Sequence, residues 1–443
     1  MRMENLKYKI ITYGCQMNIH ESEKAAGIIE NLGYNECEDL KDADLILFNT
    51  CCIRDNAEKK AFGNIGAIKK LKKAKKDLII CVMGCLTQEK GTVETIKEKY
   101  PYVDIVLGTN NLNLLDSCIV NVFNTKKKQY IVDPNEKPDI IEDERVARTS
   151  YPNAWINITF GCNNFCTYCI VPYVRGRERS RKMDDILSEF KEIISKGYKE
   201  VTFLGQNVNS YGHDLNDGSS FAKLLAEADK VEGKFRIRFM TSHPKDLTDD
   251  VIDIIANSKH ICHNIHLPIQ AGSNKILKLM NRHYSREQYL ETVRKIKEKI
   301  PDCGMTTDLM VGFPYEEEED FQDTLDIVRK VRYSSAFTFI YSIRRGTKAA
   351  EMPQVPYTVS QDRIMRLIKE QNCITKQLSK EYENKVFEVL VEDTVEKRPG
   401  YVCGRTDSGR LVTFEGDKEL IGEFVNVKIN RSQSASLFGE IVE

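Results

Sequence analysis

Short apolar runs alternate with charged, amphipathic segments along most of this 443-residue chain, and this alternation limits the possible folds more than any other feature. Three runs near the N-terminus have the length of buried strands, at residues 8–12, 44–49 and 78–83. Amphipathic segments suited to helices separate them, at residues 21–32 and 56–73. Because strands that alternate with helices pair in parallel, we expect an α/β domain with a doubly wound parallel sheet.

A second alternation of strands and helices follows, with longer units. Its six expected strands lie at residues 155–159, 201–204, 235–240, 264–267, 305–311 and 336–341. Six strand–helix units are fewer than the eight of a complete barrel, so we expect a partial (β/α)6 barrel. From residue 386 onward, short alternating strands are separated by Gly-containing turns, which is typical of a small antiparallel β-barrel.

These patterns divide the chain into three expected domains, at residues 1–123, 150–377 and 378–443. The polar segment 124–149 is expected to be a linker that contains one strand, at residues 130–132. No apolar run is long enough to span a bilayer, and no signal peptide is visible at the N-terminus. We therefore expect a cytoplasmic protein without a membrane partner. We also expect a monomer. In the cytoplasm, clustered cysteines are metal ligands or catalytic thiols more often than disulfides.

Three of the 14 cysteines form a C-x3-C-x2-C motif, and they come directly after the first expected barrel strand. Thiolate is the ligand that iron–sulfur clusters take. Three thiolates on one loop can hold three irons of a cubane cluster and leave the fourth iron open. A zinc site would need a fourth donor, and no His lies between Glu21 and Gly212. The ligands expected here are Cys162, Cys166 and Cys169.

Three further cysteines each follow one of the N-terminal strands: Cys15, Cys51 and Cys85. The carboxyl ends of parallel strands share one edge of the sheet, so we expect these thiols to meet there and to hold a second cluster. A zinc site with His20 as fourth ligand is an alternative. Cys52 and Cys81 are alternative ligands, but Cys52 is expected to open a helix and Cys81 to lie inside a strand.

The C-x3-C-x2-C motif, with Tyr168 before its last cysteine, resembles the signature of the radical S-adenosylmethionine (SAM) enzymes. Both cysteine sets together resemble the methylthiotransferase family, over essentially the whole chain. The branch that modifies N6-dimethylallyladenosine in tRNA is similar in the phrases TYGCQMN at 12–18, LGQNVN at 204–209, TSHP at 241–244 and HLP at 266–268. The C-terminal segment, with GRT at 404–406 and VTF at 412–414, is similar to a TRAM domain, a small RNA-binding barrel. Tyr315 departs from the family pattern, which often has Gly at that position.

The resemblance implies two 4Fe–4S clusters and two molecules of SAM per turnover. One SAM is cleaved to a radical that removes the hydrogen from carbon 2 of adenine 37, and the other supplies the methyl group. It also implies tRNA as a partner and a one-electron reductant such as flavodoxin or ferredoxin, with an unspecified sulfur donor. Besides Tyr168, polar residues at the ends of barrel strands 2 to 5 are the expected contacts to SAM or adenine: Gln206, Asn207, Ser242, Gln270 and Asp308.

Two other functions remain open at this point. Related methylthiotransferases modify threonylcarbamoyladenosine in tRNA or an aspartate of a ribosomal protein, although the QMN and QNVN phrases favour the first branch. A function of another class is a non-catalytic RNA-binding protein with structural metal sites.

Charge is distributed unevenly, although the net charge is only −1. Residues 54–76 carry nine Lys or Arg against two acidic residues, and residues 175–182 carry five against one. Such basic stripes attract nucleic-acid phosphates, and we interpret both as RNA-binding surfaces. The C-terminal barrel has nine basic and thirteen acidic residues, so any RNA role there rests on the TRAM resemblance.

Overall fold

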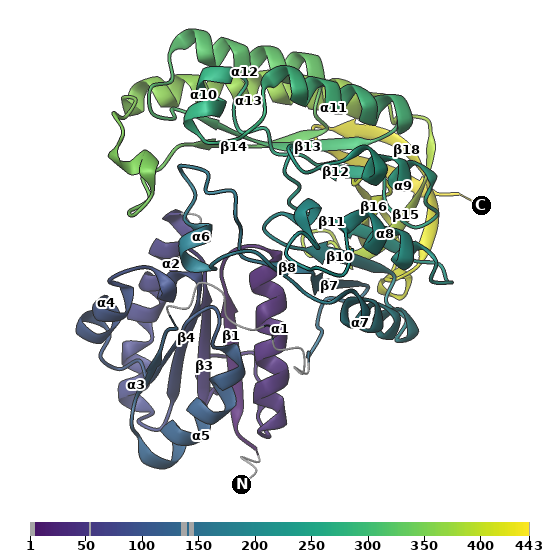
Figure 1. The fold of residues 1–443 in the computed structure, drawn as a ribbon. Helices are drawn as coiled ribbons and strands as arrows, with labels where there is room; N and C mark the ends of the chain where they lie inside the picture. The colour runs from purple at the N-terminus through teal and green to yellow at the C-terminus, as the bar shows by residue number, and fades with distance from the viewer. Residues whose placement is uncertain (1–4, 53–54, 134–139, 141–145, 443) are drawn as a thin grey trace. The chain divides into compact units, whose positions relative to one another are not determined.

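The computed structural model describes residues 5–52, 55–133, 140 and 146–442. The chain divides into two compact units, which we describe separately (Figure 1). Unit 1 contains residues 1–149 with 160–163 and 169–179, and unit 2 contains the rest of the chain. The division runs through the C-x3-C-x2-C loop, so that Cys162 and Cys169 belong to unit 1 and Cys166 to unit 2.

Unit 1 is built on a six-stranded sheet in the order β2-β1-β3-β4-β5-β6, in which every pair is parallel. The strands are β1 (Lys7–Thr12), β2 (Asn35–Glu36), β3 (Leu45–Thr50), β4 (Ile79–Gly84), β5 (Ile105–Leu107) and β6 (Gln129–Ile131). The expected doubly wound parallel sheet is confirmed. The expectation that the strand near residue 130 lies in a linker is wrong, because β6 pairs with β5 and forms the edge of this sheet.

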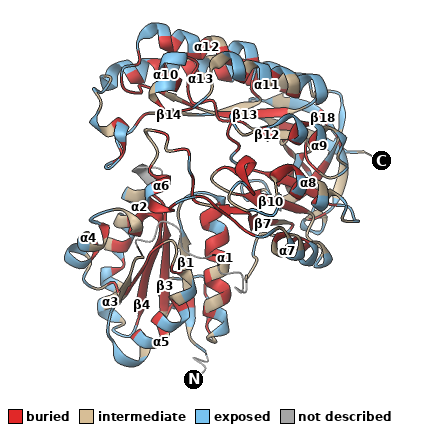
Figure 2. Cartoon of the chain, viewed as in Figure 1, coloured by how far each residue is buried: buried red, intermediate tan, exposed pale blue. Residues whose placement is uncertain are grey.

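Both faces of this sheet are covered, since residues of each strand alternate between two apolar cores. Leu45 and Leu47 join the core beneath α1 (Gln16–Asn31) and α5 (Leu115–Thr125). Ile46 and Phe48 join the opposite core, beneath α2 (Asp55–Ala67), α3 (Lys69–Ala74) and α4 (Thr92–Lys99). Figure 2 shows β3 and β4 buried throughout, which explains why these strands are continuous apolar runs in the sequence.

Unit 2 contains six parallel strands in two three-stranded sheets, β11-β10-β7 and β12-β13-β14. The strands are β7 (Asn153–Asn157), β10 (Glu200–Leu204), β11 (Arg236–Phe239), β12 (Asn264–His266), β13 (Gly304–Val311) and β14 (Ser335–Ile340). A parallel bridge from Ile237 to Ile261 continues β11 toward β12. The two sheets are thereby one open series of six strands, which confirms the expected partial barrel.

Helices cover the outer side of this series (Figure 1). They are α7 (Met183–Ser195), α8 (Phe221–Asp229), α9 (Asp249–Asn257), α10 (Asn274–Leu279), α11 (Arg286–Lys299), α12 (Glu318–Val331) and α13 (Tyr357–Lys380). The chain also forms a short helix, α6 (Val171–Val174), and a separate two-stranded sheet of β8 (Thr159–Phe160) and β9 (Arg179–Ser180). Among the described helices, none combines the length and apolar character needed to cross a membrane.

The C-terminal residues of unit 2 form a closed barrel in the order β15-β16-β17-β19-β18. Its strands are β15 (Val386–Thr394), β16 (Tyr401–Thr406), β17 (Leu411–Glu415), β18 (Phe424–Gln433) and β19 (Ser436–Ile441). The pairs are antiparallel except for β17 with β19. Two guanidinium groups tie it to the partial barrel: Arg236 donates to the carbonyl of Arg405 at 2.7 Å, and Arg238 to that of Thr406 at 2.9 Å.

Candidate functional site

The three N-terminal cysteines lie at the carboxyl ends of three adjacent strands. Cys15 follows β1 and precedes α1, Cys51 directly follows β3, and Cys85 directly follows β4. Since the sheet order is β1-β3-β4, the structure brings them to one edge of unit 1. Cys51 and Cys85 are buried, whereas Cys15 is exposed.

Two glycines allow the loops that carry these cysteines to approach one another. Gly14 has φ +119°, and a Cβ built on it would lie 2.7 Å from Cβ of Cys51. Gly84 has φ +102°, and a Cβ there would lie 2.3 Å from the carbonyl oxygen of Thr50. Only glycine fits such crowded left-handed positions. The Gly-Cys pairs at 14–15 and 84–85 are therefore a packing requirement of this edge.

Two buried asparagines join the same loops. Asn49, at the end of β3, donates through Nδ2 to the carbonyl of Asn18 at 2.7 Å and to Oγ of Ser22 at 3.0 Å. Asn18 in turn donates through its Nδ2 to Oδ1 of Asn49 at 3.3 Å and to the carbonyl of Thr50 at 3.1 Å. Neither asparagine has exposed surface. This network fixes the first turn of α1, after Cys15, against the end of β3, before Cys51.

Cys85 has polar neighbours that the sequence did not reveal. Arg175 donates through Nε to Sγ of Cys85 at 3.1 Å, and Cys52 hydrogen-bonds to the same sulfur. The hydrogen bond from Cys52 and the charge of Arg175 lower the pKa of Cys85 to about 7, against the effect of burial. Cys81, by contrast, packs inside the core under α1 and α5. Cys52 therefore lies at the site, whereas Cys81 does not.

His20, the fourth ligand in the zinc alternative, is fully buried in α1 and lies 3.3 Å through Nδ1 from Oε2 of Glu23. Two buried charged groups also lie at the site: Glu21, the next residue of α1, and Arg175, which follows α6. Arg175 is 4% exposed and Glu21 is 7% exposed, and the two form an ion pair at 2.6 Å.

The interpretation of residues 175–182 as an RNA-binding stripe is wrong. Arg175, Arg179 and Arg181 are all buried. Arg175 pairs with Glu21, and Arg181 pairs with Glu189 at 2.7 Å. Arg175 and Arg181 therefore serve as internal ion-pair partners, and within residues 175–182 the exposed basic residues are Arg177 and Lys182.

The C-x3-C-x2-C loop is anchored in each unit separately. In unit 1 the backbone NH of Cys162 donates to the carbonyl of Gly176 at 3.1 Å. In unit 2 Arg282 donates through Nη1 to Sγ of Cys166 at 3.4 Å, and Asn281 donates to the carbonyls of Asn164 and Phe165. Cys162 and Cys166 are buried and Cys169 is half-buried.

Residue Tyr168, the aromatic residue of the motif, packs edge-on against Phe313, with ring centroids 6.4 Å apart. It joins a small apolar cluster with α10 residues Ile276 and Leu277. The structure therefore gives Tyr168 a packing role in unit 2, two residues after Cys166 in the chain.

Buried polar atoms without a hydrogen-bond partner gather at the carboxyl ends of β7, β10 and β11. Among the described residues, those with such side-chain atoms at these strand ends are Asn157, Thr159, Asn207, Asn209, Ser242 and His243. Buried polar groups are normally satisfied, so this cluster indicates a site for a polar ligand. Its members include two of the expected contacts, Asn207 and Ser242. Asn207 also donates through Nδ2 to Asp246 at 2.6 Å.

His243 is 5% exposed, and burial together with the charges of Arg282 and Lys245 lowers its pKa to about 2. It is therefore a neutral imidazole near pH 7, and its Nδ1 accepts from the backbone NH of Lys245 at 3.3 Å. Because Nδ1 acts as the acceptor, the neutral ring carries its proton on Nε2 and can donate one hydrogen bond to a polar ligand.

The remaining expected contacts lie after β10, after β12 and within β13. Gln206 is half-buried in the loop after β10. Gln270 follows β12 at φ +73° and is bridged to Leu309 of β13. The prediction that Asp308 follows its strand is wrong, because β13 continues to Val311. Thr306, Asp308 and Met310 alternate with buried residues along β13, so Asp308 lies on the less buried face of the strand, where His266 Nε2 is 3.7 Å away.

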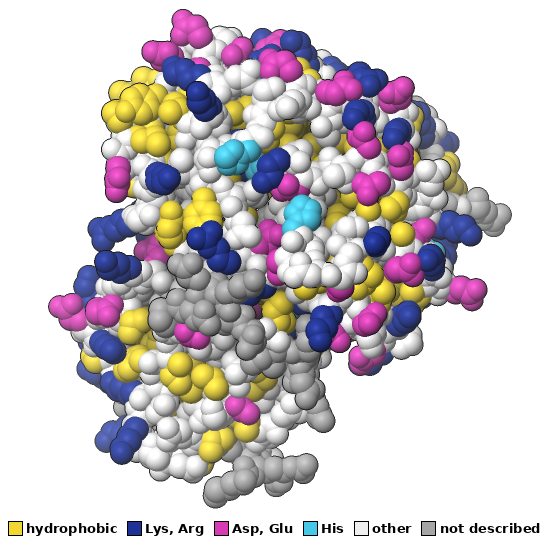
Figure 3. Space-filling model, viewed as in Figure 1, with side chains coloured by type: hydrophobic (Ala, Val, Ile, Leu, Met, Phe, Trp, Pro, Cys, Tyr) yellow, Lys and Arg dark blue, Asp and Glu magenta, His cyan; other side chains and the backbone are white. Residues whose placement is uncertain are grey.

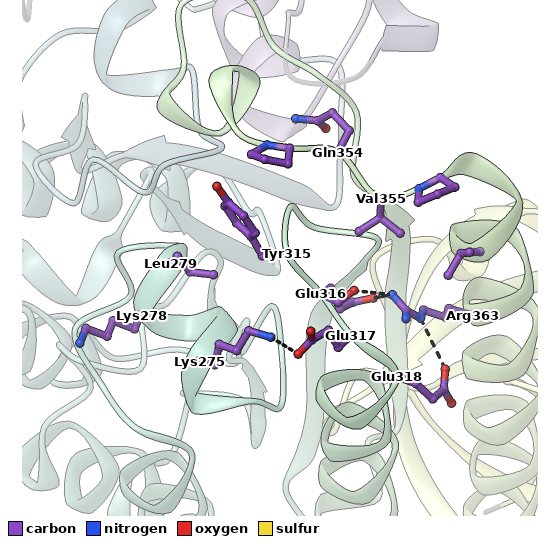
Figure 4. A pocket seen from close by; sticks show the side chains of 13 residues that line it. Lys275, Lys278, Leu279, Tyr315, Glu316, Glu317, Glu318, Gln354, Val355 and Arg363 are labelled. Atoms are coloured by element: carbon purple, nitrogen blue, oxygen red, sulfur yellow. Dashed lines mark hydrogen bonds and ion pairs between the residues drawn. The ribbon is translucent and has the colours of Figure 1, made fainter.

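A separate groove of about 1290 Å³ lies in unit 2, beside α10, α12 and α13 (Figure 4). Arg363 pairs there with Glu316 at 2.8 Å, and burial raises the pKa of Glu316 to about 7. Tyr315 lines this groove at φ +64°, a backbone conformation that favours glycine. None of the expected site residues lines it.

The lysines of residues 54–76 are mostly at the surface, although Arg54 lies outside the described residues. Lys72 pairs with Asp104 at 2.8 Å and Lys75 with Asp44 at 2.8 Å. In Figure 3, Lys and Arg side chains lie along the edge of unit 1 where α3 and α4 are placed in Figure 1. The exposed lysines of α3 and its C-terminal flank are Lys69, Lys70, Lys73 and Lys76.

Comparison with known proteins identifies the family. Residues 156–328 match the Radical SAM superfamily, residues 7–108 match "Uncharacterized protein family UPF0004", and residues 380–442 match the TRAM domain. A Clostridium botulinum (strain Langeland) protein named tRNA-2-methylthio-N(6)-dimethylallyladenosine synthase is 53% identical over 98% of this chain and 96% of its own length. The chain belongs to the tRNA-2-methylthio-N(6)-dimethylallyladenosine synthase family. A synthase of the same name from Carboxydothermus hydrogenoformans is 51% identical over 99% of this chain and 100% of its own length. The predicted resemblance to radical SAM methylthiotransferases is thus confirmed.

Solved structures agree with the fold of this synthase family member. The radical S-adenosylmethionine methyltransferase TsrM from Kitasatospora setae, with cobalamin and a 4Fe–4S cluster bound, matches at a TM-score of 0.58, with 13% identity over 79% of this chain and 77% of that chain. The cobalamin-dependent radical enzyme OxsB matches at 0.51, with 14% identity over 83% of this chain and 56% of that chain. At these identities the likeness shows the fold alone.

Proposed function

We propose that this enzyme converts N6-(dimethylallyl)adenosine at position 37 of tRNA into its 2-methylthio derivative. The observation that carries the proposal is the meeting of Cys15, Cys51 and Cys85 at one sheet edge, in a chain that also has the C-x3-C-x2-C loop. Full-length identity of about half to proteins named for this reaction supports it.

Each cysteine set suits a 4Fe–4S cluster with one open iron. The first set is Cys162, Cys166 and Cys169, and the second is Cys15, Cys51 and Cys85. The donors fit the group, because Arg282 and Arg175 each direct a charged N–H to a ligand sulfur, as expected around anionic clusters. When bound, the first cluster supplies an electron for SAM cleavage and the second presents sulfur for transfer.

The polar cluster at the ends of β7, β10 and β11 suits SAM and the target adenine. Asn207 and Ser242 offer partnerless buried atoms, and neutral His243 adds a third polar group. Gln206, Gln270, Asp308 and Tyr168 complete the proposed contacts. We propose that this site binds SAM, with two molecules used per turnover, and that these side chains orient the ligands and exclude water.

The tRNA-binding surface and the cellular compartment follow from the same proposed function. The exposed lysines on and just after α3 support an electrostatic contact with tRNA phosphates, and the C-terminal barrel suits the RNA-binding role of a TRAM domain. We propose a cytoplasmic monomer that receives electrons from a flavodoxin or ferredoxin. The proposed domains are residues 1–123, 150–377 and 378–443. Residues 124–149 connect the first two, and within them β6 belongs to the sheet of the first domain.

Nucleoside mass spectrometry of tRNA tests this function. A strain in which the gene is deleted should lose 2-methylthio-N6-(dimethylallyl)adenosine and accumulate the unmethylthiolated nucleoside, and the wild-type gene should restore the product. A C15A variant should fail to restore it, whereas C81A, with a buried cysteine outside the site, should succeed. An unchanged level of the product after deletion would refute the proposal. Loss of a threonylcarbamoyl derivative or of a ribosomal aspartate modification would favour the related substrates.

A further inference from the structure

We propose that Arg175, clamped by Glu21, is a positioning residue that raises the reduction potential of the cluster held by Cys15, Cys51 and Cys85. This inference rests on the proposed function, since it presumes that these cysteines bind a cluster. The contact that carries it is the 3.1 Å hydrogen bond from Nε of Arg175 to Sγ of Cys85. A positive N–H group at a ligand sulfur stabilises the more negative, reduced cluster over the oxidised one.

Glu21 determines how the guanidinium is presented. Its two carboxylate oxygens accept from Nη1 at 2.6 Å and from Nη2 at 3.3 Å, which leaves Nε directed to the sulfur. Glu21 and Arg175 are both buried, so neither charge is screened effectively by water. The carboxylate therefore acts in two ways: it orients the positive group, and its own charge opposes the effect of that group on the cluster.

The backbone of Arg175 is held as firmly as its side chain. Its NH donates to the carbonyl of Val171 at 2.8 Å, which closes the single turn of α6. Its carbonyl accepts from Nη2 of Arg179 at 3.3 Å, and the carbonyl of Val174 accepts from Oγ1 of Thr109 at 2.8 Å. Arg175 also follows Cys169 by only six residues. One short segment therefore carries a ligand of the first cysteine set and the charged donor to the second.

Arg282, which also contacts a ligand cysteine, has different partners. Arg282 lies 3.4 Å from Sγ of Cys166, and its further bonds go to neutral oxygens, of Tyr284 at 2.9 Å and of Pro268 at 2.8 Å. A carboxylate clamp is thus found at Arg175 and not in these contacts of Arg282. This difference makes Arg282 a matched control, because it lies at the first set of cysteines and in unit 2.

The test isolates the second cluster by replacing Cys162, Cys166 and Cys169 with Ala. After anaerobic reconstitution, iron is counted, and the midpoint potential is measured by a redox titration followed by electron paramagnetic resonance. In this background R175M should shift the potential to a more negative value, and E21Q should shift it to a more positive value. R175K keeps the positive charge but loses the guanidinium group that bonds Glu21 and Cys85 together, so it should give a smaller negative shift. R282M should give no shift.

The opposite signs separate electrostatic tuning from a structural role, which would disturb the cluster in the same direction in both variants. Should R175M lose its iron, R175K and E21Q still carry the comparison. The proposed second cluster stands if the background protein, which lacks Cys162, Cys166 and Cys169, holds about four irons. If R175K and E21Q in that background leave the midpoint potential unchanged, or shift it in the same direction, the inference about Arg175 is overturned. A background protein without iron refutes the proposed second cluster, and the inference with it.

Discussion

Replacing Asn49 by Ala should loosen the sheet edge at which Cys15, Cys51 and Cys85 meet. The change removes three hydrogen bonds of the buried side chain, two to Asn18 and one to Ser22. At about 1 kcal/mol net for each bond, the loss in local stability is about 3 kcal/mol. Because 1.4 kcal/mol is a factor of ten, amide exchange through local opening should become about 100-fold faster.

Hydrogen exchange followed by mass spectrometry resolves this effect by peptide. Exchange should accelerate in β3 and at the start of α1, and it should stay unchanged in β10 of unit 2. Fluorescence of Trp155, the single tryptophan, would miss the change because that residue lies in unit 2. N64A is the matched control, since the exposed Asn64 donates through Nδ2 to the hydroxyl of Tyr13 at 2.6 Å.

The control should change exchange by less than about tenfold, since one exposed hydrogen bond contributes at most about 1 kcal/mol. If the amides of β3 exchange as slowly in N49A as in the wild type, or as slowly as in N64A, then the asparagine pair does not hold this edge together.

Three further changes have defined outcomes. G84A should lower the melting temperature far more than G91A, because both glycines have left-handed φ but a Cβ at Gly84 alone would meet backbone, at Thr50. Buried His243 has a pKa of about 2 against an ordinary 6.5, so urea unfolding should reveal a loss of stability as pH falls below about 6.5 that is smaller in H243Q. In filter-binding assays, tRNA binding should become weaker and less dependent on salt when glutamate replaces the exposed lysines of α3 and its C-terminal flank, which are Lys69, Lys70, Lys73 and Lys76.

Each of these expectations has an outcome that contradicts it. Equal melting temperatures for G84A and G91A would mean that the loop before Cys85 can yield. An identical pH profile for wild type and H243Q would mean that the imidazole is not held neutral by its surroundings. If the salt dependence of tRNA binding persists after the four lysine substitutions, and matches that of control substitutions at Lys196 and Lys230, the tRNA binds at another surface.

The sequence predicted most of the fold because its strands are buried on both faces and separated by amphipathic helices. The strand expected at residues 44–49 is observed at Leu45–Thr50, and the one at 305–311 at Gly304–Val311. The position of each N-terminal cysteine after its strand followed directly. Shorter elements gave less signal: β5 and β6 have three residues each, and β6 is recognised only by its pairing with β5.

Side-chain roles that depend on distant partners could not be predicted. The run of arginines that contains Arg175 resembles an RNA-binding stripe in sequence, because its ion-pair partner Glu21 is 154 residues away. The expectation that Asp308 follows its strand conflicts with the strand expected at residues 305–311, which contains it, and β13 includes Asp308. The partnerless polar atoms near Ser242 likewise become visible only when three strand ends are brought together.

The central claim is that two sets of three cysteines each hold a 4Fe–4S cluster, and iron and sulfide analysis of the anaerobically purified chain tests it most directly. We predict about eight irons and eight sulfides per wild-type chain. Replacing Cys162, Cys166 and Cys169 with Ala should leave about four of each, as should replacing Cys15, Cys51 and Cys85. One or two zinc ions per chain would contradict this claim. So would about four irons in the wild type that are lost on replacing one set of cysteines and kept on replacing the other.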